Sequence, residues 1–181
     1  RIVREHYNPI IEKIRALEKP VVCVVNGVAA GAGANIALAC DIVIAGTSVA
    51  FIQAFSKIGL IPDSGGTFFL PRLVGFGKAS ALMMLGDKVS ATDAERMGMI
   101  YKVVDDPLLQ DEALAIAKTL SELPTKAIGL TKRLLNQSMF NPLERQLEYE
   151  GDTQVHAAQS EDYREGVKAF LEKRKPVFSG A

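Results

Sequence analysis

Apolar residues recur every three or four positions over residues 2–18, with arginine, glutamate and lysine between them. This period predicts an amphipathic helix that ends before Pro20. Residues 21–25 are then a short β-branched run bounded by Asn26 and Gly27, and this length and composition favour a buried strand. Small residues follow and lead into a predicted helix over residues 34–40.

The alternation of short apolar runs and polar corners continues to residue 104. Ser90 is a predicted N-cap, and Pro71 is expected to break one helix. The remaining chain is predicted to be entirely helical, because its apolar residues keep a helical spacing between prolines. The expected strands are residues 41–45, 48–53 and 99–104, and the expected helices are residues 68–74, 78–85, 108–122, 124–139, 142–159 and 160–174. Strands that alternate with helices before a helical tail predict an α/β fold with two parts, residues 1–106 and 107–181.

Composition narrows the classes of function. The chain has 181 residues, with 21 basic and 21 acidic side chains, and this neutral balance argues against nucleic acid or an anionic membrane as partner. Cys23 and Cys40 lack the spacing of a metal site, so we expect reduced core thiols and no metal. Without an 18-residue apolar run or a leader, we expect a cytoplasmic protein that does not enter membranes.

The stretch of small residues carries the first chemical signal. Gly27, Gly31 and Gly33 alternate with alanines and would let a ligand approach the backbone closely. The helix that follows directs free N–H groups at that ligand, and such donors can stabilise an enolate or a tetrahedral oxyanion. The alternative is a turn of small residues that only packs a helix tightly on a sheet. The spacing matches neither a dinucleotide fingerprint nor a P-loop.

Four motifs together resemble the enoyl-CoA hydratase/isomerase family, also called the crotonase superfamily. They are NGVAAGAGANIALACD (26–41), GLIPDSGGT (59–67), GDKVSATDAERMG (86–98) and EGVKAFLEKRKP (165–176). The resemblance implies a crotonase-like spiral of β-β-α units, followed by a C-terminal helical oligomerisation region that forms trimers or hexamers. Family members usually begin well upstream, so we expect one of two oxyanion-hole donors to lie outside this sequence.

The resemblance also implies roles for residues at two glycine corners, the first around Gly31 and the second over residues 60–67. The backbone N–H of Ala32, between Gly31 and Gly33, corresponds to an oxyanion-hole donor. The two glutamates that activate water in the hydratases fall on Asn35 and Phe55, which cannot exchange protons near neutral pH.

Asp63 occupies the position where proton-moving members of the family carry their working carboxylate. Leu60 and Phe55 are expected as apolar walls, and Gly31, Gly33 and Asn35 as further substrate contacts. The alternative for Asp63 is an ordinary turn aspartate or helix cap.

These implied residues favour an acyl-CoA isomerase with one aspartate as acid and base. The expected reactions are 1,2-epoxyphenylacetyl-CoA to oxepin-CoA and a Δ3 to Δ2 shift of enoyl-CoA. A hydratase of the same family and a noncatalytic scaffold are the alternatives. No separate cofactor is expected, because coenzyme A is part of the substrate.

The last motif implies a coenzyme A contact. Phe170 and Lys173 correspond to residues that reach coenzyme A bound mainly to a neighbouring subunit. The alternative is that Phe170 is a core residue and Lys173 a solvated charge.

Overall fold

The computed structural model describes all of residues 1–181, which divide into two compact units. The first unit comprises residues 1–15 and 21–115, and the second comprises residues 16–20 and 116–181. None of the helices combines the length and the apolar character needed to cross a membrane. The oligomerisation role expected of the C-terminal helices stays a prediction.

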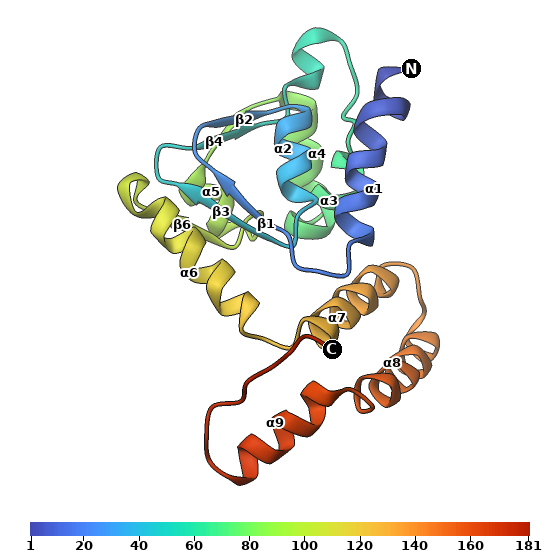
Figure 1. The fold of residues 1–181 in the computed structure, drawn as a ribbon. Coiled ribbons are helices and arrows are strands. Elements are labelled where there is room, and N and C mark those ends of the chain that lie inside the picture. The colour runs from blue at the N-terminus through green and yellow to red at the C-terminus, as the bar shows by residue number, and fades with distance from the viewer. The chain divides into compact units, whose positions relative to one another are not determined.

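Two small sheets form the centre of the first unit (Figure 1). The first sheet is parallel, in the order β1-β3-β6, with strands Val22–Val25, Ile42–Gly46 and Lys102–Val104. The second has the order β2-β4-β5, with strands Val28–Ala30, Ala50–Ile52 and Lys88–Ser90; β2 is parallel and β5 antiparallel to β4. The hydrophobic pattern did not predict β2 and β5. Each has three residues and one buried side chain, which is too short to establish a period of two.

Helices α2, α3 and α4 lie on one side of the two sheets (Figure 1). Phe51, Ile44 and Leu70 are among the largest fully buried side chains and belong to β4, β3 and α3. The chain begins with a π-helical segment, Val3–Tyr7, that continues into α1. The other helical segments of this unit are α1 (Asn8–Ala16), α2 (Ala32–Leu38), the 3-10 helix η2 (Ala54–Ile58), α3 (Gly66–Val74), α4 (Phe76–Leu85), α5 (Ala91–Arg96) and the 3-10 helix η3 (Asp106–Leu108).

Two local predictions had different outcomes. Ser90 caps α5 as expected, because its hydroxyl accepts a hydrogen bond from the N–H of Asp93 at 3.1 Å. The predicted break at Pro71 was wrong, since α3 runs through this residue without interruption. The proline removes one hydrogen bond of α3, the bond to the carbonyl of the exposed Thr67, and the helix continues beyond it to Val74.

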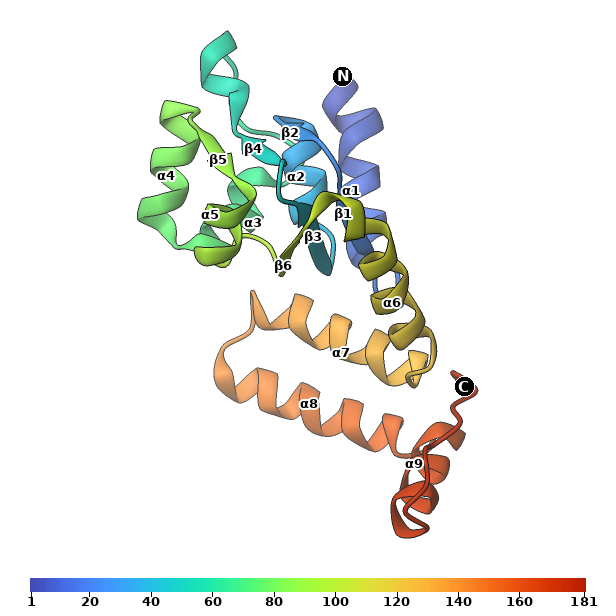
Figure 2. The ribbon, with the colours of Figure 1, turned by 90° about the vertical axis from the view of Figure 1, so that its left-hand side faces the viewer.

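The second unit is built from helices. Helix α6 (Leu109–Ser121) crosses the boundary, and α7 (Thr125–Ser138), α8 (Leu143–Ala157) and α9 (Glu161–Leu171) follow. Helices α7 and α8 run side by side in opposite directions (Figure 2). The Nζ of the buried Lys132 on α7 donates to the carbonyl of Lys19 at 3.0 Å, which attaches residues 16–20 to this helix.

Residues 174–180, the C-terminal strap, are bonded to α9 by two carboxylates. Asp162, which is buried, accepts hydrogen bonds from the N–H groups of Ser179 at 2.7 Å and Gly180 at 2.9 Å. Glu165 accepts from both terminal nitrogens of Arg174, at 2.6 and 2.8 Å, and from the N–H of Val177 at 2.9 Å. Arg174 and then the Val177 N–H lower the pKa of Glu165 to about 2.

Candidate active site

The first glycine corner joins β2 to α2 at Gly31. This residue has φ +54°, and its N–H donates to the carbonyl of Ile52 at 2.9 Å. The ring of Phe55 lies 3.6 Å from the position that a Cβ at Gly31 would occupy. A side chain here would adopt an unfavourable backbone conformation, although its Cβ would make only ordinary van der Waals contact with Phe55, so the corner favours glycine for its backbone conformation. Gly31 and Phe55, both expected at the site, are therefore in contact.

The N-terminus of α2 presents unpaired backbone donors. The first hydrogen bond of the helix runs from the N–H of Asn35 to the carbonyl of Gly31, at 3.2 Å. The N–H groups of Ala32 and Gly33 precede this bond and have no partner in the chain. Ala32 is half-buried and Gly33 is exposed. The Ala32 N–H is thus available to a ligand, as an oxyanion donor must be.

Asn35 joins the first glycine corner to the second. Its side chain is fully buried, and its Nδ2 donates to the backbone carbonyl of Asp63 at 2.8 Å. Its Oδ1 accepts from the Nε2 of the buried Gln53 at 2.7 Å. A Cβ at Gly66 would overlap the amide of Asn35, so the close approach of the two corners requires glycine at this position.

Asp63 and Ser64 contribute the carboxylate of the second corner and the hydroxyl group that binds it. The half-buried Asp63 accepts a hydrogen bond at Oδ1 from the hydroxyl of Ser64, at 2.9 Å, and its Oδ2 has no partner in the chain. The backbone carbonyl of Asp63 also accepts the N–H of Gly66 at 2.9 Å. Ser64 has φ +51° and its side chain is fully buried. A single carboxylate with one free oxygen can accept a proton and return it.

Sequence reasoning missed two members of this network, Gln53 and Ser64. Ser64 lies inside the Asp-Ser-Gly-Gly motif but carried no signal of its own, because many serines form turns. Gln53 offered a weaker signal, a polar residue at the end of a buried strand. Leu60, expected as an apolar wall, follows η2 with 60% of its surface exposed, and its N–H donates to the carbonyl of Phe55 at 3.0 Å.

Phe170 and Lys173 lie in the second unit, at the end of α9. Phe170 is 82% exposed, so the alternative of a core residue was wrong. Lys173 is exposed and has φ +54°. The N–H of Arg174 donates to the carbonyl of Ala169 at 3.0 Å, which is the hydrogen bond of a left-handed helix end.

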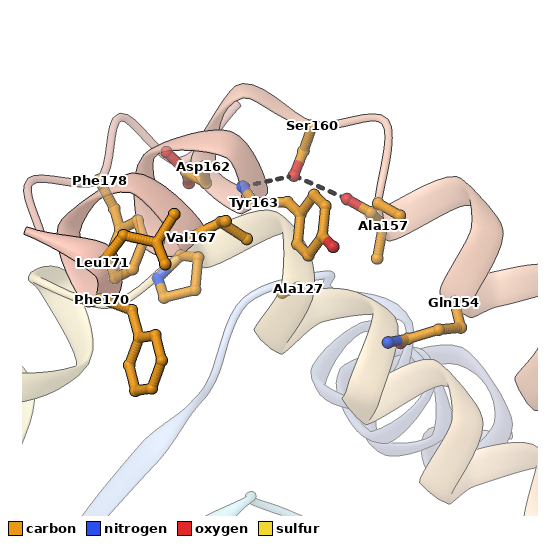
Figure 3. Close-up of a pocket in the computed structure, with 13 residues that line it drawn as sticks. Ala127, Gln154, Ala157, Ser160, Asp162, Tyr163, Val167, Phe170, Leu171 and Phe178 are labelled. Atoms are coloured by element: carbon orange, nitrogen blue, oxygen red, sulfur yellow. Dashed lines mark hydrogen bonds between the residues drawn. The ribbon is translucent and has the colours of Figure 1, made fainter.

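A pocket of about 440 Å³ lies beside α9 (Figure 3). Tyr163, Val167 and Phe170 contribute to its lining at helical spacing, and Asp162 and Ser160 are among its few polar groups. None of its lining residues comes from the glycine corners. The largely apolar lining gives α9 an exposed apolar face.

Comparison with known proteins shows that the whole chain, and not only its motifs, is similar to one family. The family model described as enoyl-CoA hydratase/isomerase matches residues 1–181. The chain is 52% identical over 178 residues to the 1,2-epoxyphenylacetyl-CoA isomerase of Escherichia coli K12, covering 98% of this chain and 68% of that protein. It is 46% identical to a Rhodobacter capsulatus protein named "Probable enoyl-CoA hydratase", covering 99% and 70%.

A solved structure agrees with the fold. The crystal structure of an enoyl-CoA hydratase from Bacillus anthracis matches with a TM-score of 0.93 at 33% identity, covering 99% of this chain and 70% of that one. The two expected features of the fold, strands with interleaved helices and a helical C-terminal part, are therefore confirmed.

Proposed function

Because the chain belongs to the enoyl-CoA hydratase/isomerase family, we propose that it isomerises acyl-CoA thioesters with Asp63 as acid and base. The specific reaction is the conversion of 1,2-epoxyphenylacetyl-CoA to oxepin-CoA, together with a Δ3 to Δ2 shift of enoyl-CoA double bonds. Similarity to the Escherichia coli isomerase supports this choice of substrate.

One observation carries the proposal: the corner holds the carboxylate of Asp63 while an amide and a phenyl ring occupy positions 35 and 55. Asn35 is bonded on both sides by Gln53 and Asp63, and Phe55 packs on Gly31. Neither side chain can activate a water molecule by proton exchange. The corner therefore supports a reaction that needs one carboxylate.

Isomerisation of an enoyl thioester fits such a site. The free Oδ2 of Asp63 takes a proton from the carbon between the double bond and the thioester, and the electron pair moves into a dienolate. The N–H of Ala32 donates to the thioester oxygen, where the negative charge gathers. The carboxyl group then returns the proton to the far carbon of the dienolate, so no atom is gained or lost.

Phe170 and Lys173 are proposed to contact the coenzyme A part of the substrate, in a trimer or a hexamer where neighbouring subunits share a site. Their exposure supports this role, since neither side chain is used inside its own unit. An aromatic face suits the adenine ring and an ammonium group suits phosphate.

The proposal is tested by incubating the full-length protein separately with 3-enoyl-CoA, 2-enoyl-CoA and 1,2-epoxyphenylacetyl-CoA and separating the products by chromatography. The first substrate is expected to give the 2-enoyl isomer, and the second to give no 3-hydroxyacyl product. Rapid hydration of the 2-enoyl thioester would identify a hydratase instead. Failure to turn over either substrate or the epoxide, despite binding, would favour a noncatalytic scaffold.

Asp63→Asn keeps the shape of the side chain and removes the proton acceptor. Turnover is expected to fall roughly a hundred- to ten-thousandfold, the usual contribution of general acid and base catalysis, with thioester affinity nearly unchanged. Asp152→Asn makes the same chemical change at an exposed position of α8 and is the matched control. A variant at position 63 that retains more than a tenth of the turnover would overturn the assignment.

A further inference from the structure

The second corner holds Asp63 at two separate points. Its backbone carbonyl accepts from the Nδ2 of Asn35 at 2.8 Å and from the N–H of Gly66 at 2.9 Å. Its carboxylate is held at Oδ1 by the hydroxyl of Ser64, at 2.9 Å. These bonds fix both the backbone and the side-chain rotation of Asp63, and they leave only Oδ2 unoccupied.

The orientation of the Asn35 amide follows from its neighbours. The carbonyl of Asp63 can only accept a hydrogen bond, so the NH₂ group of Asn35 must face it. The amide oxygen then faces Gln53, whose Nε2 donates at 2.7 Å. A reversed amide would place two oxygens against each other at the Asp63 carbonyl.

The hydrogen bond from Gln53 to Asn35 is accompanied by an unfavourable free-energy term at Gln53. Its side chain is 2% exposed, and its Oε1 is buried with no hydrogen-bond partner in the chain. An unsatisfied buried oxygen opposes folding, and native proteins contain few of them. The fold thus accepts an unpaired atom at Gln53 while its Nε2 keeps the Asn35 amide oriented toward Asp63.

Ser64 carries a second cost. Its φ of +51° is a backbone conformation that favours glycine, as at the neighbouring Gly65 with φ +77°. Glycine would relieve this strain at position 64, but it would remove the hydroxyl that holds Oδ1 of Asp63. Two unfavourable features therefore support the same residue, Asp63, one at its backbone and one at its carboxylate, which is the pattern expected of a functional site.

We propose that Asn35 and Ser64 are positioning residues that hold Asp63 so that Oδ2 alone exchanges the proton with the substrate. The bond from Asn35 fixes the position of the Asp63 backbone, and the bond from Ser64 to Oδ1 leaves Oδ2 of Asp63 free. This inference rests on the proposed role of Asp63, and it gives the buried Asn35 a task other than contact with the acyl group.

Ser64→Gly is the main test, because glycine accepts the backbone conformation and lacks the hydroxyl. We expect the kcat of the full-length protein for 3-enoyl-CoA to fall roughly ten- to a hundredfold, as for loss of a hydrogen bond to a charged group. KM should change less than about twofold, because the interaction acts on proton transfer. Ser138→Gly, at the exposed end of α7, is the matched control and should leave both constants unchanged. Wild-type kcat in Ser64→Gly would overturn the role of Ser64.

Asn35→Asp tests the second contact, since it replaces the NH₂ donor by an oxygen of nearly the same size. A similar fall in kcat at little changed KM is expected, and the near-ultraviolet circular dichroism spectrum shows whether the variant keeps its tertiary structure. Wild-type turnover in a folded Asn35→Asp variant would overturn the role of Asn35.

A double-mutant cycle separates positioning from general damage to the fold. In an Asp63→Asn background no proton-accepting oxygen remains to be positioned, so Ser64→Gly should cause no further loss of the residual rate, measured with enzyme in excess. An equal loss in both backgrounds would show that Ser64 acts independently of Asp63 and would overturn the proposal. High turnover by Asp63→Asn alone would instead refute the role of Asp63, so the two failures are distinguishable.

Discussion

Ser64 and Lys173 are the two residues other than glycine with a left-handed backbone, and one lies in each unit. Ser64 is fully buried, and its hydroxyl is bonded to Asp63. Lys173 is exposed, follows the exposed Phe170 by one turn, and its ammonium group has no partner in the chain. The same backbone strain, about 1 kcal/mol or more, therefore supports a side-chain contact at Ser64, whereas at Lys173 it supports only the backbone hydrogen bond that ends α9 and leaves the side chain free.

This difference indicates two ways of preparing a site. At the glycine corners the hydrogen bonds that hold Asp63 are made without any ligand, so a substrate would meet an already ordered carboxylate. The end of α9 presents a fixed backbone with free side chains, which an outside partner can engage. We expect changes at the corners to affect stability and chemistry together, and changes at α9 to affect mainly binding.

Gly66→Ala should have the largest effect, because its new methyl group would overlap the Asn35 amide. Overpacking of a buried contact costs about 1–3 kcal/mol, and the displaced amide would also release Asp63. Thermal or denaturant unfolding measures the first effect and kcat the second. Gly33→Ala is the control for stability, because its Cβ would meet no atom within 4 Å. Equal stability of both variants would contradict the tight junction of the corners.

Substitutions of Lys173 separate its backbone role from its charge. Lys173→Ala and Lys173→Gly should both raise the KM for coenzyme A thioesters several-fold at little changed kcat. Only glycine removes the left-handed strain, so Lys173→Gly should be more stable than Lys173→Ala by about 1 kcal/mol. Steady-state kinetics and thermal unfolding, with the oligomeric mass measured by light scattering, check the two effects. Unchanged KM in both variants would refute the coenzyme A contact.

The smallest effect is expected for the pH dependence of stability, to which the ion pair between Glu165 and Arg174 of the C-terminal strap contributes. The pKa of Glu165 is lowered from 4.5 to about 2 by Arg174 and the Val177 N–H. A group with a lowered folded-state pKa contributes stability above its unfolded value, and this contribution is lost as the pH falls from 4.5 toward 2. Glu165→Gln should therefore flatten the pH dependence of unfolding in that range. Parallel pH curves for the variant and the wild type would show that the ion pair adds nothing.

The sequence predicted most helices from the period of their apolar residues, and it predicted β1, β3, β4 and β6 because each lies within a longer run of mainly apolar residues. It did not predict β2 or β5, whose positions depend on pairing with β4 and not on local pattern. Pro71 shows the opposite limit, since a strong local signal for a helix break was overridden by the surrounding helix.

The candidate site likewise contains residues that the sequence could identify and contacts that it could not. The resemblance to the family identified Asp63, Asn35 and Ala32 as candidates, because their motifs match the motifs that carry these roles in the family. The bond between Asn35 and Asp63 joins residues 28 apart in sequence, and the contacts of Gln53 and Ser64 depend on how the corners meet. Phe170 shows a further limit: helical spacing reveals an apolar face but not whether the chain itself covers it.

The bonds from Asn35 and Gly66 to position 63 end on its backbone carbonyl and do not depend on its side chain. Any residue that tolerates the local conformation could occupy this position without dismantling the junction of the two corners. A reactive group could thus be gained, lost or exchanged there by single mutations during evolution while the architecture persists. Because the backbone contacts that join the corners do not depend on the reactive side chain, proteins descended from one ancestor could acquire different reactions while most of the variants in between still fold.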